Sequence, residues 1–309
     1  MKEVHEIGWC RTYRSALMAI LLIMSSMGTI SAKTVMRLES QLSVDRAYIG
    51  QTVCLTVRLI TSDPEISFVS LDSDLIISGV TFVKAESINN NDGILRADEK
   101  KGSDTYSAVV YRCLFIPDRS GTVTIPDLEF RVGHRRPVMI DHPFFGRMRS
   151  STIEEERITS KALKIKVYSL PEAPVGFSGA VGRFTVSSTV PPGNIYSDGT
   201  GIVVYTVSGI GNLQPEMISK MNKTTPSGMR IKSESVEESR YVEGNELQNN
   251  LEIVCDAVFD SAGEFEIPPV QFIYFDPYVR SYVTARSNPV KLHVEESGLP
   301  SRPRPSHNI

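Results

Sequence analysis

Residue types that could do chemistry are scattered along this chain rather than gathered in one place. Its five histidines have no metal-ligand spacing to a cysteine or a carboxylate. No G-x-S-x-G, Walker or H-E-x-x-H motif occurs, and no serine, cysteine or lysine is marked out as a nucleophile. We therefore expect no catalytic, cofactor-binding or metal-binding residues, and we expect the protein not to be an enzyme.

The cysteines raise one alternative, which is an inter-sheet disulfide. Cys54 and Cys113 are 59 residues apart on two expected strands, a spacing compatible with such a bridge in an exported protein. However, the two cysteines lie on different faces of their strands relative to the apolar side chains. Cys113 shares the apolar strand face with Tyr111 and Phe115, whereas Cys54 alternates with the apolar side chains of its own strand. We interpret Cys54, Cys113 and Cys255 as small strand residues, and leave the disulfide as the alternative.

One segment, residues 133–157, concentrates side chains that suit binding. Arginine and phenylalanine are enriched at interaction hot spots, and the segment has the appearance of an irregular loop rich in both. The alternatives are a mobile surface insertion, or rings that cap the open edge between two sheets. The candidate partner-binding residues are Arg135, Arg136, Phe144, Phe145, Arg147 and Arg149.

An internal repeat shows which elements position these residues. YRCLFIPDRSGTVTIPDLEFRV (111–132) aligns without a gap on IVCDAVFDSAGEFEIPPVQFIY (253–274), with six identities. Each copy has an apolar alternating run, an Asp-x-x-Gly turn and a second run broken by proline, which predicts a β-hairpin. Closing strands match at 160–167 and 287–294, so the first copy carries 15 extra residues between hairpin and closing strand. Two copies indicate two domains.

Short alternating runs separated by turns predict an all-β fold, with two tandem immunoglobulin-like β-sandwich domains. Gly209–Pro215, GIGNLQP, is expected to leave its strand as a turn. The net charge of -3 and the scattered basic residues give no footprint for nucleic acid. The expected divisions are a sandwich at 36–168 with the insertion 133–157, a linker at 169–177, a sandwich at 178–295 and a disordered tail at 296–309.

The start of the chain predicts export. Basic residues precede the apolar run SALMAILLIMSSMGTISA, which ends in small residues, so residues 1–32 resemble a secretory signal peptide with cleavage after Ala32. An uncleaved membrane anchor is the alternative. No later apolar run is long enough to span a membrane, so we expect no C-terminal anchor. The expected location is the periplasm or the envelope.

The order of four segments resembles the BatD family of bacterial oxygen-tolerance (aerotolerance) proteins. They are YIGQTVCLTVRL, FIPDRSGTVTIPDLEF, AVGRFTVSSTV and SGIGNLQP, within a match that covers roughly 36–294. The resemblance implies tandem immunoglobulin-like domains on the periplasmic side. It also implies von Willebrand type A domain membrane proteins as partners and, indirectly, a MoxR-type ATPase. Family members usually continue into a C-terminal transmembrane segment, and this chain departs from that pattern.

The sequence thus predicts a non-enzymatic, exported protein-interaction scaffold with no small-molecule substrate. The alternative function is a cell-surface adhesin or glycan-binding β-sandwich protein, which would need an exposed aromatic platform or a calcium cluster.

Overall fold

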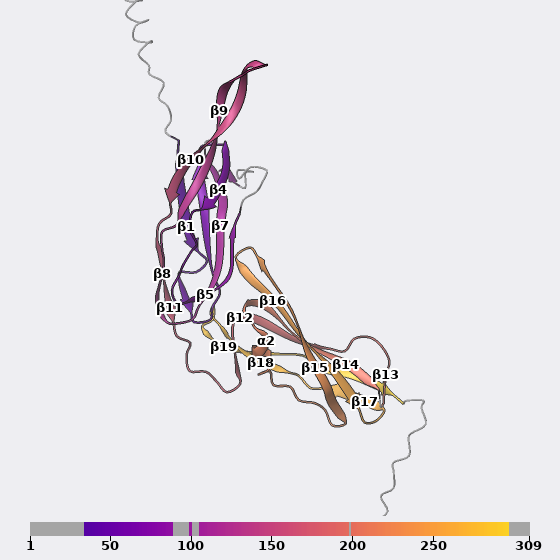
Figure 1. Cartoon of the computed structure of the whole chain (residues 1–309). Coiled ribbons are helices and arrows are strands. Elements are labelled where there is room, and N and C mark those ends of the chain that lie inside the picture. Colours follow the sequence, from indigo (N-terminus) through magenta and orange to yellow (C-terminus); the bar gives the residue numbers. More distant parts are fainter. Residues whose placement is uncertain (1–33, 89–98, 101–104, 198, 297–309) are drawn as a thin grey trace, which may run out of the picture.

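The computed structural model describes residues 34–88, 99–100, 105–197 and 199–296, and over these residues the chain is an all-β sandwich fold with one four-residue helix. The predictions for the signal peptide and for residues 297–309 lie outside the described residues. The strands fall into two groups that share no sheet, termed here the first half (36–168) and the second half (177–295). The two halves lie end to end (Figure 1). That they are two separate immunoglobulin-like domains stays a prediction.

The first half has three sheets: β1-β3-β7-β5 with β6 beside β7, β10-β9-β4, and β2-β11-β8. Its strands are β1 (Met36–Leu42), β2 (Arg46–Tyr48), β3 (Val53–Thr61), β4 (Ile66–Leu71), β5 (Val80–Ser87), β6 (Glu99–Lys100), β7 (Tyr106–Pro117), β8 (Gly121–Ile125), β9 (Glu129–His142), β10 (Gly146–Thr159) and β11 (Leu163–Tyr168).

The second half has two sheets: β15-β16-β14-β12-β18-β19 and β13-β20-β17. Its elements are β12 (Phe177–Thr189), β13 (Ile195–Tyr196), β14 (Thr200–Asn212), the helix α2 (Pro215–Ile218), β15 (Met229–Glu243), β16 (Glu246–Phe259), β17 (Gly263–Ile267), β18 (Gln271–Asp276), β19 (Ser281–Arg286) and β20 (Val290–Glu295).

Each half buries its own apolar core, as alternation along the strands predicts. In the first half, Leu55 and Phe115 from the large sheet pack with Ile125 and Ile165 from the β2-β11-β8 sheet. In the second half, the equivalent layers form a separate cluster. Because side chains alternate across a strand, one face of each sheet is buried and the other is left to solvent or to the neighbouring half.

The repeat is confirmed at the level of strand pairing, but the predicted β-hairpin is wrong. Strands β7 and β8 do not pair with each other: β7 lies between β3 and β5, and β8 pairs with β11. Strands β16 and β17 repeat this arrangement beside β14 and β20. The Asp-x-x-Gly turn carries the chain from one sheet to the other, because Val123 and Ile125 must face the core from the opposite layer.

A pair of buried serines fixes the same junction in both halves. The Ser160 hydroxyl accepts a hydrogen bond from the Leu128 N–H, and the Ser287 hydroxyl accepts one from the Val270 N–H, each at 3.0 Å. In return the two serine N–H groups donate to the carbonyls of Leu128 and Val270. These bonds satisfy polar backbone where the chain enters the closing strand. The closing strands predicted from the sequence are therefore real equivalents.

The predicted turn at GIGNLQP is wrong, because β14 continues through both glycines to Asn212 before α2 begins. A Cβ atom at Gly209 would lie 2.1 Å from the Arg183 carbonyl oxygen, and one at Gly211 would lie 2.4 Å from that of Val181. Both glycines have positive φ, 150° and 134°. They therefore permit a close approach of β12 to β14 rather than ending the strand.

The halves touch through a small apolar cluster. Leu247, just after the β15–β16 turn, packs with Cys54 and Leu114 on the outer face of the first half's large sheet. Nearby, a Cβ atom on Gly50 would lie 2.9 Å from a Val181 methyl carbon, so the halves are in close contact there too. This contact explains why Cys54 is buried although it faces away from its own core.

Candidate functional site

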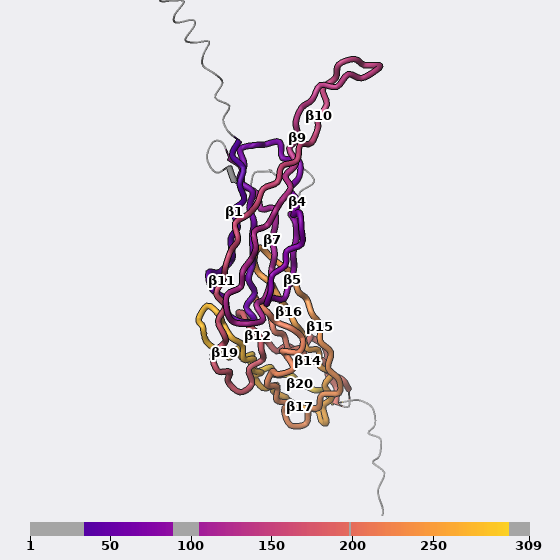
Figure 2. Tube along the Cα trace, turned by 60° about the vertical axis from the view of Figure 1, so that its left-hand side comes forward, coloured from indigo at the N-terminus to yellow at the C-terminus, as the bar shows by residue number. Residues whose placement is uncertain are grey.

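The insertion at 133–157 is not an irregular loop, as the sequence analysis expected, but the outer part of a long two-stranded hairpin. Strands β9 and β10 pair from Glu129 with Thr159 out to His142 with Gly146, without a register shift. Figure 2 shows this hairpin projecting beyond the rest of the first half. Beyond His134 no side chain of the two strands is buried, so a ladder of backbone bonds rather than a buried face keeps this outer part extended.

The insertion is wholly explained by strand length. The repeat partner of this hairpin is β18–β19, which begins at the aligned position Gln271. The first hairpin has 14 residues in each strand, whereas each strand of the second has six. The sequence could give the number of extra residues but not their conformation.

The base of the hairpin is fixed by a buried carboxylate on the β3–β4 connection. Asp63 Oδ2 lies 2.9 Å from His134 Nδ1 and 3.0 Å from the Arg136 guanidinium. Asp63 Oδ1 accepts a hydrogen bond from the Glu65 N–H at 2.9 Å. His134 is buried, and its Nε2 atom lies 3.6 Å from a Glu156 carboxylate oxygen across the hairpin.

These contacts set the charge of the site. Burial by itself would raise the pKa of Asp63, but the hydrogen bonds from Glu65 and His134 and the charge of Arg136 outweigh it and lower that pKa. Asp63 is therefore ionised over the physiological range. Its contacts with His134 and Arg136 hold the base of the hairpin in place. This anchor was missed by sequence reasoning, since Asp63 and His134 are 71 positions apart.

The tip of the hairpin projects beyond the β-sandwich (Figure 2). Phe144 and Phe145 are 88% and 75% exposed, so neither ring caps the edge of the sandwich. The Phe144 N–H donates to His142 Nδ1 at 3.2 Å, and the His142 ring lies 4.9 Å from that of Phe145. Two large, exposed apolar side chains are thus held at the tip of the hairpin, and their recorded ring contacts within the described chain are to His142 alone.

The four candidate arginines do not form one cluster. Pairing and alternation place Arg135, Arg147 and Arg149 on one face of the hairpin, and Arg136 on the other. Arg136 is partly engaged by Asp63 and lies 3.7 Å from Glu154. Of the four, Arg147 and Arg149 lie nearest to the phenylalanines in the sequence, and both are exposed.

Sequence reasoning also overlooked exposed apolar residues along the hairpin. They are Met139, Ile140, Met148 and Ile153, each 40% to 50% exposed. Met139 pairs with Arg149, and Ile140 pairs with Met148, so apolar atoms continue behind the tip on both faces. The signal in the sequence was the apolar run VMI at 138–140, which carries no weight once the segment is treated as a loop.

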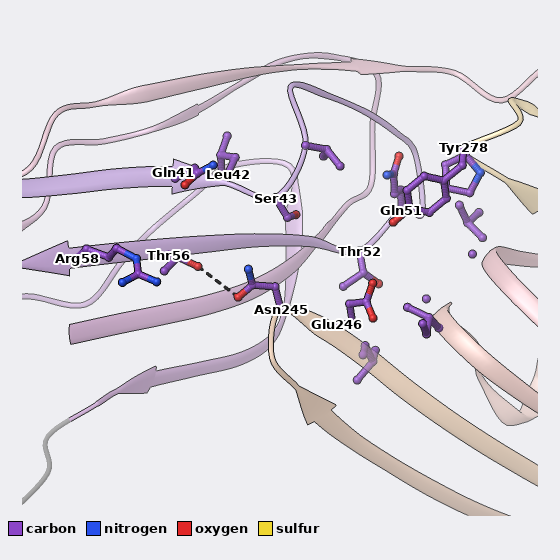
Figure 3. A pocket seen from close by; sticks show the side chains of 17 residues that line it. Gln41, Leu42, Ser43, Gln51, Thr52, Thr56, Arg58, Asn245, Glu246 and Tyr278 are labelled. Carbon is purple, nitrogen blue, oxygen red and sulfur yellow. Dashed lines mark hydrogen bonds between the residues drawn. The ribbon is translucent and has the colours of Figure 1, made fainter. Parts of the chain in front are cut away.

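A second candidate site is a cleft of about 380 Å³ between the halves. Its labelled side chains in Figure 3 are neutral and polar for the most part, with Arg58 and Glu246 as the charged exceptions. Thr56 donates to the Asn245 amide oxygen at 3.4 Å across the contact. Tyr278 lines the cleft, with the Arg183 guanidinium 4.1 Å from its ring centre. No sequence pattern could have found it, because its walls come from both halves.

The three cysteines among the described residues form no disulfide. Cys54, Cys113 and Cys255 are free and buried, so the disulfide alternative is contradicted. Cys54 pairs with Leu114 while Cys113 pairs with Leu55, which places the two thiols on opposite faces of the sheet, as their phases predicted. Burial raises the pKa of Cys113 and of Cys255 to about 11, which disfavours the reactive thiolate.

Within residues 34–88, 105–197 and 199–296, no three histidine, cysteine or acidic side chains are grouped as metal ligands. In the same part of the chain, no helix has the length and apolar character needed to cross a membrane.

Comparison with known proteins gives no match to a family model or to a curated protein.

Proposed function

We propose that this protein is a non-enzymatic, exported interaction scaffold of a BatD-like oxygen-tolerance system in the bacterial envelope, and that the β9–β10 tip is where it binds a protein partner. The resemblance of four ordered sequence segments supports the system. The resemblance also supports von Willebrand type A domain membrane proteins as the partners, with a MoxR-type ATPase acting indirectly. The signal-peptide pattern supports the location.

The observation that carries the proposal is the exposure of Phe144 and Phe145 at the end of an anchored hairpin. Exposed aromatic rings gain nothing in the folded monomer, because their apolar surface stays in water. The hairpin base is held by Asp63, and strand pairing continues from there to His142 and Gly146, beside the rings. Aromatic and arginine side chains in such a place are the usual centres of binding energy.

The test is recovery of partners from the native envelope with the tagged full chain. The Phe144→Ser/Phe145→Ser variant should recover at least tenfold less von Willebrand type A partner than the wild type, while its melting temperature stays nearly unchanged. A matched control is Ile76→Ser, which also removes an exposed apolar side chain, 78% exposed, from the first half but away from the hairpin. Equal recovery by both variants would remove the binding role from the tip.

One observation favours glycan binding as a second candidate function. The cleft between the halves combines an aromatic ring, Tyr278, with neutral hydrogen-bonding side chains such as Gln51 and Asn245. Rings and amides of this kind bind sugar faces and hydroxyls. Selective retention of the wild-type chain on a glycan surface, lost in Tyr278→Ala and kept in Phe144→Ser/Phe145→Ser, would support this function over the scaffold.

A further inference from the structure

The cleft between the halves differs in chemistry from one end to the other. Figure 3 shows Arg58 at one end and Tyr278 at the other. Thr56 and Thr52 lie between them on the wall formed by the first half. Arg58 and Thr52 are six residues apart in the sequence, which corresponds to ~20 Å of extended chain. With a volume of about 380 Å³, the cleft therefore suits an elongated small ligand.

Arg58 is a half-buried cation that no described carboxylate neutralises. It alternates with the core residues of β3, so its side chain lies on the outer face, where its cross-strand partner on β1 is Glu39. Glu39 is bound instead by Arg37, at 2.9 Å. Within residues 34–88, 105–197 and 199–296, no ion pair joins Arg58 to a carboxylate. Partial burial of an unpaired charge costs free energy, and it leaves the guanidinium N–H groups as unused donors.

Further positive charge lies around Arg58. A second hollow, which shares Arg58 with the cleft, includes Lys161 in its lining. On β7, Arg112 pairs with Thr56 and lies 3.8 Å from Glu86. The charged side chains near Arg58 are the basic Arg37, Lys84, Arg112 and Lys161 and the acidic Glu39 and Glu86. Positive charge thus exceeds negative charge at this end of the cleft, which favours an anionic group on the ligand.

The Tyr278 end offers a ring and neutral groups instead. The Tyr278 side chain is 58% exposed, although the Arg183 guanidinium lies 4.1 Å from its ring centre. Gln51 lines the same end of the cleft and carries an amide group. Glu246 lies beside Thr52 in Figure 3, so a second anionic group on the ligand would be repelled there. The cleft therefore favours a single negative charge, placed at the Arg58 end.

We propose that the cleft binds a uronic-acid oligosaccharide, one that carries a single carboxylate, with its acidic sugar at Arg58. A guanidinium binds a carboxylate through two parallel N–H···O bonds, which fixes the orientation of the acidic sugar. The hydroxyl of Thr56 and the amide of Asn245 suit sugar hydroxyls, and the Tyr278 ring suits an apolar sugar face.

This inference rests on the second candidate function, glycan binding at the cleft, and adds the class of glycan and its direction. It is compatible with protein binding at the β9–β10 tip, because the tip projects from the end of the first half that lies away from the cleft (Figure 1).

The experiment is calorimetric titration of the full chain with two probes that differ only in charge. They are aldotetraouronic acid, in which a glucuronic acid is attached to a xylose trisaccharide, and its uncharged methyl ester. The wild type should bind the acid at least tenfold more tightly than the ester, because only the acid carries the carboxylate that pairs with Arg58.

Variants separate recognition of the charge from support of the fold. Arg58→Gln keeps a polar side chain, so it should bind the acid at least tenfold more weakly than the wild type does and bind the ester equally well. Tyr278→Ala should weaken the binding of both probes. The control Arg230→Gln removes the same charge from β15, at a side chain that is 71% exposed and paired with Asp260, and should bind both probes like the wild type.

The outcomes that overturn the inference are distinct. Equal binding of acid and ester by the wild type, or an equal loss of both in Arg58→Gln, would show that Arg58 does not recognise a carboxylate, while glycan binding at the cleft would stand. Binding of neither probe would overturn the inference and the second candidate function together. Binding of a polyglutamate peptide in place of the acid, lost in Arg58→Gln and kept in Tyr278→Ala, would assign the cleft to an acidic peptide. Recovery of envelope partners through the tip is unaffected by any of these results.

Discussion

The β9–β10 and β18–β19 hairpins are the same element placed in two situations. The shorter one has six-residue strands, and its strand residue Phe275 packs against Tyr48 of the neighbouring half. The longer one has 14-residue strands and carries its rings out into solvent. The short hairpin therefore contributes a buried strand ring to the contact between the halves, and the long hairpin contributes none from its outer part. An exposed apolar segment that does not stabilise the fold is a strong candidate for binding.

The largest contrast is expected from removing one ring in each hairpin. Phe275 is fully buried between Tyr48 and Tyr282, with ring centres 4.9 Å and 5.3 Å away. Phe275→Ala should lower the free energy of unfolding by about 3 to 5 kcal/mol, as loss of a buried aromatic does. Phe145→Ala should change it by less than about 0.5 kcal/mol. Urea denaturation measures both, and equal losses would show that the long tip is part of the fold after all.

The next largest effect is the loss of stability on removing Asp63, which holds the base of the long hairpin. Asp63 binds His134 and Arg136 with a side chain that is only 5% exposed. Asp63→Ala should cost about 2 kcal/mol, less than a fully buried pair because the Arg136 side chain is 39% exposed. Glu154→Ala, which removes a 68% exposed partner of the same arginine, is the control and should cost little. Faster amide exchange along β9 would accompany the first change alone.

The Asp63 carboxylate also makes the stability of the long hairpin's base depend on pH. Because the pKa of Asp63 is lowered in the folded protein, its stabilisation is present above its unfolded pKa, near about 4, and is lost as the pH falls through the folded value. The stability difference between wild type and Asp63→Asn should therefore be constant at neutral pH and shrink below about pH 4. The side chains that face the Asp63 carboxylate are His134 and Arg136. A difference that grows on acidification would contradict this account.

The sequence predicted the strands of both copies because their apolar alternation is dictated by burial, as at Val123 and Ile125. It could not predict that β7 and β8 join different sheets, since pairing depends on how the sandwich closes. The outer part of β9–β10 escaped prediction because a projecting ribbon buries no face. The Asp63 anchor and the cleft at Asn245 escaped it because their members meet only in the folded chain.

The smallest expected effect compares the fifth position of the two turns. Arg280 is the one described non-glycine residue with positive φ, and its counterpart Gly146 has the same conformation with no atom near its missing Cβ. Arg280→Gly should stabilise the protein by roughly 0.5 kcal/mol, since relief of the left-handed conformation outweighs the added freedom of the unfolded chain. Gly146→Ala should have the opposite sign. Thermal melts of the two variants check this pair, and destabilisation by Arg280→Gly would mean that the arginine side chain holds the turn.

The central claim is that the long tip meets another protein, while the short hairpin faces the first half of its own chain. The most direct measurement places a photoreactive benzoylphenylalanine at Phe145 or at Tyr278 of the full chain in its native envelope. Illumination at position 145 should give an adduct between separate protein chains, lost when Phe144 is also changed to serine. Illumination at position 278 should give only a link within the chain to residues near Gln51. An adduct to lipid alone at position 145, or no adduct at all, would contradict the claim.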